Sequence, residues 1–113
     1  MSTQHLALQT CAPCHTAGSP MAAAEVQKLM PQVANWILHP SGKKIQRKLT
    51  FKGFAKAVYC VNLSTYVSDI TGHHADVRFG WGYCQIDYTT HDVDGLTLND
   101  FICAAKLDQL LDQ

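Results

Sequence analysis

The spacing of apolar residues changes repeatedly along residues 21–111, and this alternation limits the folds open to the chain. Steps of three or four predict helices, and steps of two predict strands. The helices fall at 21–33, 51–72 and 95–111, and strand pairs fall at 35–51 and 76–91. The order αββαββα predicts an α+β fold, with one four-stranded antiparallel sheet and three helices packed on one face.

Individual residues refine this prediction. The segment 51–72 ends at Gly72, a natural helix stop, and we expect its inner face to be Phe54, Val58, Val61 and Thr65. The last helix opens with Thr97 three residues before Asp100, which resembles a capping box. Its expected inner stripe is short and consists of Phe101, Ala104, Ala105, Asp108 and Leu111.

The strand pairs predict which side chains face the helices. In the first hairpin, Ile45, Leu49 and Phe51 fall on the same strand face, and Arg47 interrupts this apolar face. In the second hairpin, the expected inner residues are Cys84, Ile86 and Tyr88. The second sheet face and the outer edges then need protection, which favours self-association as a dimer or tetramer.

Composition narrows the functional classes. The chain has 113 residues, 47% of them apolar, and nine basic residues balance nine acidic ones. We therefore expect one globular domain, with no electrostatic indication of nucleic acid or an anionic membrane as partner. No apolar run approaches the roughly 18 residues that cross a bilayer. The start of the chain lacks the pattern of a secretory signal, so a cytoplasmic location is expected.

The chain has five cysteines, and an odd number suits a reducing compartment better than a set of disulfides. Cys60, Cys84 and Cys103 are predicted to be small buried residues. Residues 1–20 are expected to form an N-terminal tail, ahead of a folded domain at 21–113. The tail contains the sequence CAPCH. Its Cys11, Cys14 and His15 could attach haem, bind zinc with His5 as nearest fourth ligand, or form a redox pair. A modest structural or redox role is the preferred interpretation.

Three of the six histidines are grouped. His73 and His74 follow the end of the long helix, and His91 follows the last strand. Asp69 precedes His73 by four residues and could orient its ring if helical geometry persists; Asp100 lies nine residues after His91. Imidazoles can donate and accept protons near neutral pH, so acid–base catalysis is favoured. A three-histidine zinc site and a purely structural role remain open, as does a simple helix-dipole role for Asp100.

At these residues the sequence resembles the pterin-4a-carbinolamine dehydratase family. The resemblance covers about residues 22–111. Its central motif is an acidic residue, a His-His pair, a third histidine and a later aspartate. It also includes Trp36, the FKGF segment at 51–54 and the GLTLNDF segment at 95–101. Ala75 stands where the family usually has proline. Bacterial-type members often have a Cys-x-x-Cys near the start, which CAPCH would match.

The resemblance implies dehydration of a 4a-hydroxytetrahydropterin to a quinonoid dihydropterin, in tetrahydrobiopterin recycling for phenylalanine hydroxylase. The resemblance implies no metal or organic cofactor. It also implies that the protein assembles as a homotetramer. Our hypothesis makes His73 and His91 the acid–base pair, with His74 polarising the pterin, and Asp69 and Asp100 orienting imidazoles. Because some animal relatives are dimerisation cofactors of a homeodomain transcription factor, the alternative is a protein-binding scaffold with vestigial activity. A zinc or haem protein is the third possibility.

Overall fold

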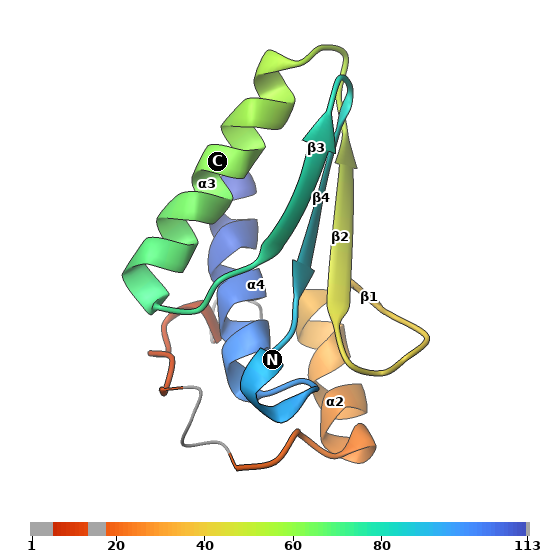
Figure 1. Ribbon diagram of the computed structural model, residues 1–113, viewed down its shortest axis with the longest axis vertical. Coiled ribbons are helices and arrows are strands. Elements are labelled where there is room, and N and C mark those ends of the chain that lie inside the picture. The colour runs from red at the N-terminus through yellow and green to blue at the C-terminus, as the bar shows by residue number, and fades with distance from the viewer. Residues whose placement is uncertain (1–5, 14–17, 113) are drawn as a thin grey trace.

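A four-stranded antiparallel sheet organises the computed structural model, which describes residues 6–13 and 18–112 (Figure 1). The spatial order of the strands is β1-β2-β4-β3. Two hairpins, β1 with β2 and β3 with β4, are joined side by side where β2 pairs with β4. The strand bounds are Ile37–Leu38 for β1, Ile45–Thr50 for β2, Asp76–Gly80 for β3 and Tyr83–Tyr88 for β4.

The helices lie against one face of this sheet, as the pattern αββαββα predicted (Figure 1). Helix α3 and helix α4 cross that face side by side, and α2 lies beside the end of the sheet near β1. The bounds are Ala23–Leu29 for α2, Ala55–Thr71 for α3 and Leu98–Leu111 for α4, with short 3-10 turns η2 at Met30–Val33 and η3 at His91–Val93. The predicted fold class is therefore confirmed.

Helix α4 is the centre of the core. The expectation of a short inner stripe was wrong, because nearly every side chain from Asn99 to Asp108 is buried. Residues 6–13 explain the difference, since they cover the side of α4 that would otherwise meet solvent. Leu6 is only 1% exposed, and the Lys106 Nζ donates a hydrogen bond to the carbonyl oxygen of Ala7 at 2.6 Å. The division into a tail at 1–20 and a domain at 21–113 stays a prediction.

Helix α3 presents a different face to the core from the one we predicted. Its buried residues are Ala57, Cys60, Ser64, Val67 and Ser68. These small side chains let α3 approach its neighbours closely, and the bulkier aromatic residues are left outside. Phe54, expected inside, is 50% exposed and packs on the ring of Phe79, with 5.9 Å between ring centroids. Hydrophobic spacing alone gave no means of choosing between these two faces.

Arg47 interrupts the apolar parity of β2 because it forms part of a polar network in the core. Its guanidinium donates to Asp108 on α4, and the indole Nε1 of Trp36 donates to the same carboxylate at 2.9 Å. Burial raises the pKa of Asp108, although Trp36 and the positive charge of Arg47 oppose this effect. The network joins β2, α4 and the chain segment before β1.

Replacing Arg47 with methionine should therefore destabilise the fold by about 3 kcal/mol at neutral pH, since it leaves the Asp108 carboxylate buried without its cation. Arg47 lowers the pKa of Asp108, so the loss of Arg47 raises that pKa further, and this fixes the sign of the pH dependence. The unfolded state releases the proton more easily, so the loss should shrink as the pH falls and Asp108 becomes protonated. Urea unfolding at pH 7 and pH 4.5, with Lys48→Met as control, measures this. An equal loss at both pH values would contradict the assignment.

The face of the sheet opposite the helices is mainly polar, although Ile37 and Tyr83 are also exposed on it. Gln46 and Gln85 each donate a hydrogen bond to the carboxylate of Asp87 at 3.1 Å, and Lys44 lies 3.6 Å from it. Cross-strand polar pairs of this kind can face water without a covering layer. Self-association therefore stays a prediction that this face does not require. None of the helices in residues 6–13 and 18–112 is long and apolar enough to cross a bilayer.

Candidate active site

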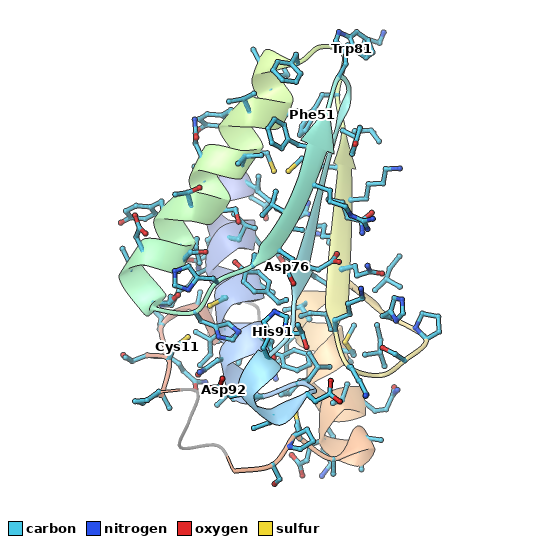
Figure 2. All side chains as sticks on the ribbon, viewed as in Figure 1. Cys11, Phe51, Asp76, Trp81, His91 and Asp92 are labelled. Atoms are coloured by element: carbon cyan, nitrogen blue, oxygen red, sulfur yellow. The ribbon has the colours of Figure 1, made fainter. Side chains whose placement is uncertain are left out.

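The three grouped histidines meet at one end of the sheet. His73 and His74 follow Gly72, whose φ of +74° ends α3 in a left-handed turn. His91 begins η3, just after β4. Figure 2 shows His91 and Asp92 at the end of the sheet opposite Trp81. A pocket of about 160 Å³ lies between these segments, and its lining is Gly72, His73, His74, Thr89, His91 and Asp92.

His73 is the buried member of the group. Its side chain is only 4% exposed, and its Nε2 lies 2.6 Å from Oδ1 of Asp100. The imidazole also stacks on the ring of Tyr88, with ring centroids 6.1 Å apart and planes 14° from parallel. A side chain held by a hydrogen bond at one end and by ring stacking has little freedom to turn. His73 is thus fixed in place between α4 and β4.

Asp100 is fully buried and links His73 to the start of α4. Its second oxygen, Oδ2, accepts hydrogen bonds from the Thr90 hydroxyl and from the backbone N–H of Thr97, both at 2.9 Å. The second bond completes the capping box that the sequence predicted. The carboxylate therefore has partners on both oxygens, as a buried charge requires. It stabilises the helix start and orients an imidazole at the same time.

The charge of Asp100 changes the proton affinity of His73. Burial disfavours the charged imidazole, but the hydrogen bond to Asp100 and its negative charge outweigh burial, so the pKa of His73 is raised above its ordinary value. His73 therefore keeps its positive charge to a higher pH than a free histidine does. A fixed positive charge at the pocket wall favours the departure of an electron-rich group.

His74 and His91 are both exposed and line the pocket. The side chain of His91 is 72% exposed, and its Nε2 lies 3.4 Å from Oδ2 of Asp76 on β3. Figure 2 places Asp76 next to His91. These two imidazoles can reach a bound molecule and exchange protons with it, which the buried ring of His73 does less readily. The pocket therefore combines one fixed cation with two accessible proton carriers.

Asp69 does not take the position that the sequence suggested. The expected contact with His73 assumed that α3 continues to His73, whereas the helix ends at Thr71 and the left-handed Gly72 turns the chain. The side chain of Asp69 is exposed and makes no hydrogen bond or ion pair with another residue in the described part of the chain. Asp100 is the residue that orients His73.

Sequence reasoning missed Thr90, which is 1% exposed and whose hydroxyl lies 2.8 Å from the hydroxyl of Thr97 and 2.9 Å from Asp100. A single threonine at the end of a strand belongs to no sequence motif that predicts a functional role. The only available signal was its position next to His91.

The alternative zinc or haem site at Cys11, Cys14 and His15 cannot be placed. Cys14, His15 and His5 lie outside the described residues. Cys11 is described, and its Sγ lies 3.6 Å from the Sγ of Cys103 on α4. Within residues 6–13 and 18–112, no three or more histidine, cysteine or acidic side chains are grouped so as to hold a metal ion.

Together, the fold and the pocket define a small α+β protein whose imidazole-lined pocket is suited to acid–base chemistry on a small molecule. The family profile described as pterin 4 alpha carbinolamine dehydratase matches residues 19–110. The chain belongs to this family.

Similar proteins support the assignment over nearly the whole chain. A protein of Nitrosospira multiformis named "Putative pterin-4-alpha-carbinolamine dehydratase" is 40% identical over 93% of this chain and 91% of its own length. A protein of the same name from Methylococcus capsulatus is 36% identical over 97% of this chain and 96% of its own. The crystal structure of a transcriptional coactivator/pterin dehydratase from Brucella melitensis has a similar fold. Its TM-score is 0.75 at 18% identity, over 81% of this chain and 98% of that one.

Proposed function

We propose that the protein dehydrates a 4a-hydroxytetrahydropterin to the quinonoid dihydropterin at the pocket between His74 and His91. The single observation that supports this most is the grouping of three imidazoles around one cavity in a chain of the dehydratase family. In the reaction the 4a-hydroxyl leaves as water and a ring nitrogen loses its proton. One acid and one base are therefore needed, and no electrons are exchanged.

The exposures of the histidines favour a division of labour different from our hypothesis from the sequence. His74 and His91 are exposed in the pocket, and we assign the two proton transfers to them. His73 is buried and held by Asp100, so we assign it a positioning and electrostatic role. A fixed imidazolium would stabilise negative charge that develops on the departing oxygen. No step in this scheme uses a metal or an organic cofactor.

A wider role follows from the same reaction. Dehydration is one step in recycling the tetrahydropterin used by aromatic amino acid hydroxylases, and a separate two-electron reduction of the quinonoid product must complete the cycle. We propose that phenylalanine hydroxylase is the client. A protein-binding role is a second candidate. Three bulky side chains on the outer face of α3, Tyr59, Tyr66 and Ile70, are more than half exposed. An apolar helix face of this kind is typical of an interface between subunits or with another protein.

The test of the enzymatic proposal is a stopped-flow assay of carbinolamine loss. The 4a-hydroxytetrahydropterin is generated rapidly, and its disappearance is followed by absorbance with and without the purified protein. We expect the protein to accelerate the loss in proportion to its concentration, at a rate well above that in buffer. A rate unchanged by stoichiometric protein would contradict the proposal and favour the protein-binding role.

A further inference from the structure

Two thiols from opposite ends of the chain lie together beside α4. Cys103 is fully buried on the helix, and Cys11 is partly exposed in the N-terminal segment. Their Sγ atoms are 3.6 Å apart, and both thiols are reduced. This separation is a direct contact, so only a small local movement is needed to bring the two sulfur atoms to bonding distance.

The contact is held in place by hydrogen bonds on both sides of Cys11. Asn99 of α4 pairs with the backbone of Ala12, accepting from its N–H at 2.9 Å and donating to its carbonyl oxygen at 2.6 Å. Before Cys11, Lys106 donates to the carbonyl oxygen of Ala7. Because these bonds fix the segment along α4, the two sulfur atoms meet as part of the folded structure.

We propose that Cys11 and Cys103 are a redox-active pair that closes into a disulfide when a hydroperoxide oxidises Cys11. The Cys11 thiolate attacks the peroxide oxygen, which breaks the O–O bond and gives a sulfenic acid and a hydroxide or alkoxide ion. The Cys103 thiol then attacks this sulfur, the S–S bond forms, and water leaves. Two electrons pass from the two sulfur atoms to the peroxide, and a dithiol reductant reverses the change by exchange.

The surroundings assign different roles to the two sulfur atoms. A hydrogen bond from Cys103 lowers the pKa of Cys11 despite partial burial, and the positive charges of His73 and Lys106 add to this effect. The same hydrogen bond and burial raise the pKa of Cys103. The thiolate is the nucleophile, so Cys11, which is also the more exposed sulfur, reacts first. Cys103 resolves the intermediate.

A second thiol pair provides an internal comparison. Cys60 on α3 and Cys84 on β4 also share a hydrogen bond, but they are only 1% and 0% exposed. An oxidant in solution cannot reach either sulfur while the protein stays folded. The two thiol pairs thus differ chiefly in whether a peroxide in solution can reach one of the sulfur atoms, as it can at Cys11. Cys60 and Cys84 therefore serve as an internal control for nonspecific oxidation.

The pair also borders the wall of the proposed pocket. The Sγ of Cys103 lies 3.4 Å from the Thr71 hydroxyl oxygen, and this oxygen accepts a hydrogen bond from the backbone N–H of His73 at 3.2 Å. Forming the disulfide draws the Cys103 sulfur toward Cys11 and therefore alters its contact with Thr71. The thiol chemistry itself does not depend on the proposed dehydratase activity, so the two can fail separately.

The test uses the folded, reduced full-length chain treated with hydrogen peroxide, followed by thiol blocking and peptide mass mapping. We expect a Cys11–Cys103 disulfide that dithiothreitol reverses, and loss of the free Cys11 thiol at least about tenfold faster than loss of Cys60. The bridge closes a long loop, so the oxidised form should melt about 10 °C higher or more.

Three variants separate this pair from other thiol chemistry. Cys14→Ser should keep the bridge, and Cys103→Ser should leave Cys11 as a sulfenic acid that dimedone traps. Cys60→Ser should leave the oxidation of Cys11 unchanged. A bridge between Cys11 and Cys14 in the unmodified protein, or equal oxidation of Cys11 and Cys60, would overturn the proposal.

Discussion

Alanine at His74 or at His91 is expected to lower the kcat for pterin dehydration by about 10²–10⁴-fold, the usual contribution of one general acid or base. Both imidazoles are exposed in the pocket and can reach a bound molecule, so each loss removes one proton transfer. The stopped-flow assay measures kcat and KM for each variant. The control is His39→Ala, because His39 lies in the turn after β1, bonded to Ser41 and outside the pocket.

Combining the two substitutions tests whether the histidines act together. If His74 and His91 serve one concerted dehydration, the double variant should lose much less than the product of the single losses. His73→Ala should lower kcat less than either, because we assign His73 an electrostatic role. A larger loss at His73 than at His74 would restore the division in which His73 and His91 are the acid–base pair. Near-normal turnover in all three variants would contradict a histidine mechanism.

The second large effect concerns the buried pair of His73 and Asp100. Asp100→Asn should lower the free energy of unfolding by about 3 kcal/mol at pH 6, since it removes a fully buried carboxylate that accepts three hydrogen bonds. Chemical denaturation measures the loss. Asp94→Asn is the matched control: Asp94 is a nearby exposed residue whose ion pair with Lys43 lies at the surface, where such pairs contribute little.

The pH dependence of this loss has a definite sign. Asp100 raises the pKa of folded His73 above the value of 6.5 that an ordinary histidine has. The charged pair therefore stabilises the fold fully below about pH 6.5, and this stabilisation disappears as the pH rises through the higher pKa of folded His73. The difference between the wild type and Asp100→Asn should consequently be largest near pH 6 and smaller at pH 9. A difference that grows with pH would contradict the assignment of the raised pKa to Asp100.

The order of helices and strands could be predicted because the period of the sequence changes at each boundary. The inner residues of β4, Cys84, Ile86 and Tyr88, follow strict alternation and are all fully buried. Thr97 and Asp100 form the predicted capping box, which depends only on residues three apart. These features are local, so spacing in the sequence is sufficient to find them.

The features that were missed depend on contacts between distant segments. Burial of α4 on nearly all sides depends on residues 6–13, which have no clear periodicity and were expected to belong to a tail ahead of the domain. Asp69 and Asp100 were both expected to orient imidazoles, with Asp69 beside His73, whereas the partner of His73 is Asp100, 27 residues away. A single left-handed residue, Gly72, decides between these two partners. Sequence spacing identifies such a stop but not the direction in which the chain continues.

The central claim is that the pocket bounded by His74 and His91 is where a pterin binds. Two-dimensional NMR of ¹⁵N-histidine-labelled protein, titrated with an unreactive 7,8-dihydropterin, tests it most directly. We predict saturable shifts of the ring resonances of His74 and His91, with those of His39 unchanged. Saturation of the protein with no shift at either of the two pocket histidines would contradict the account.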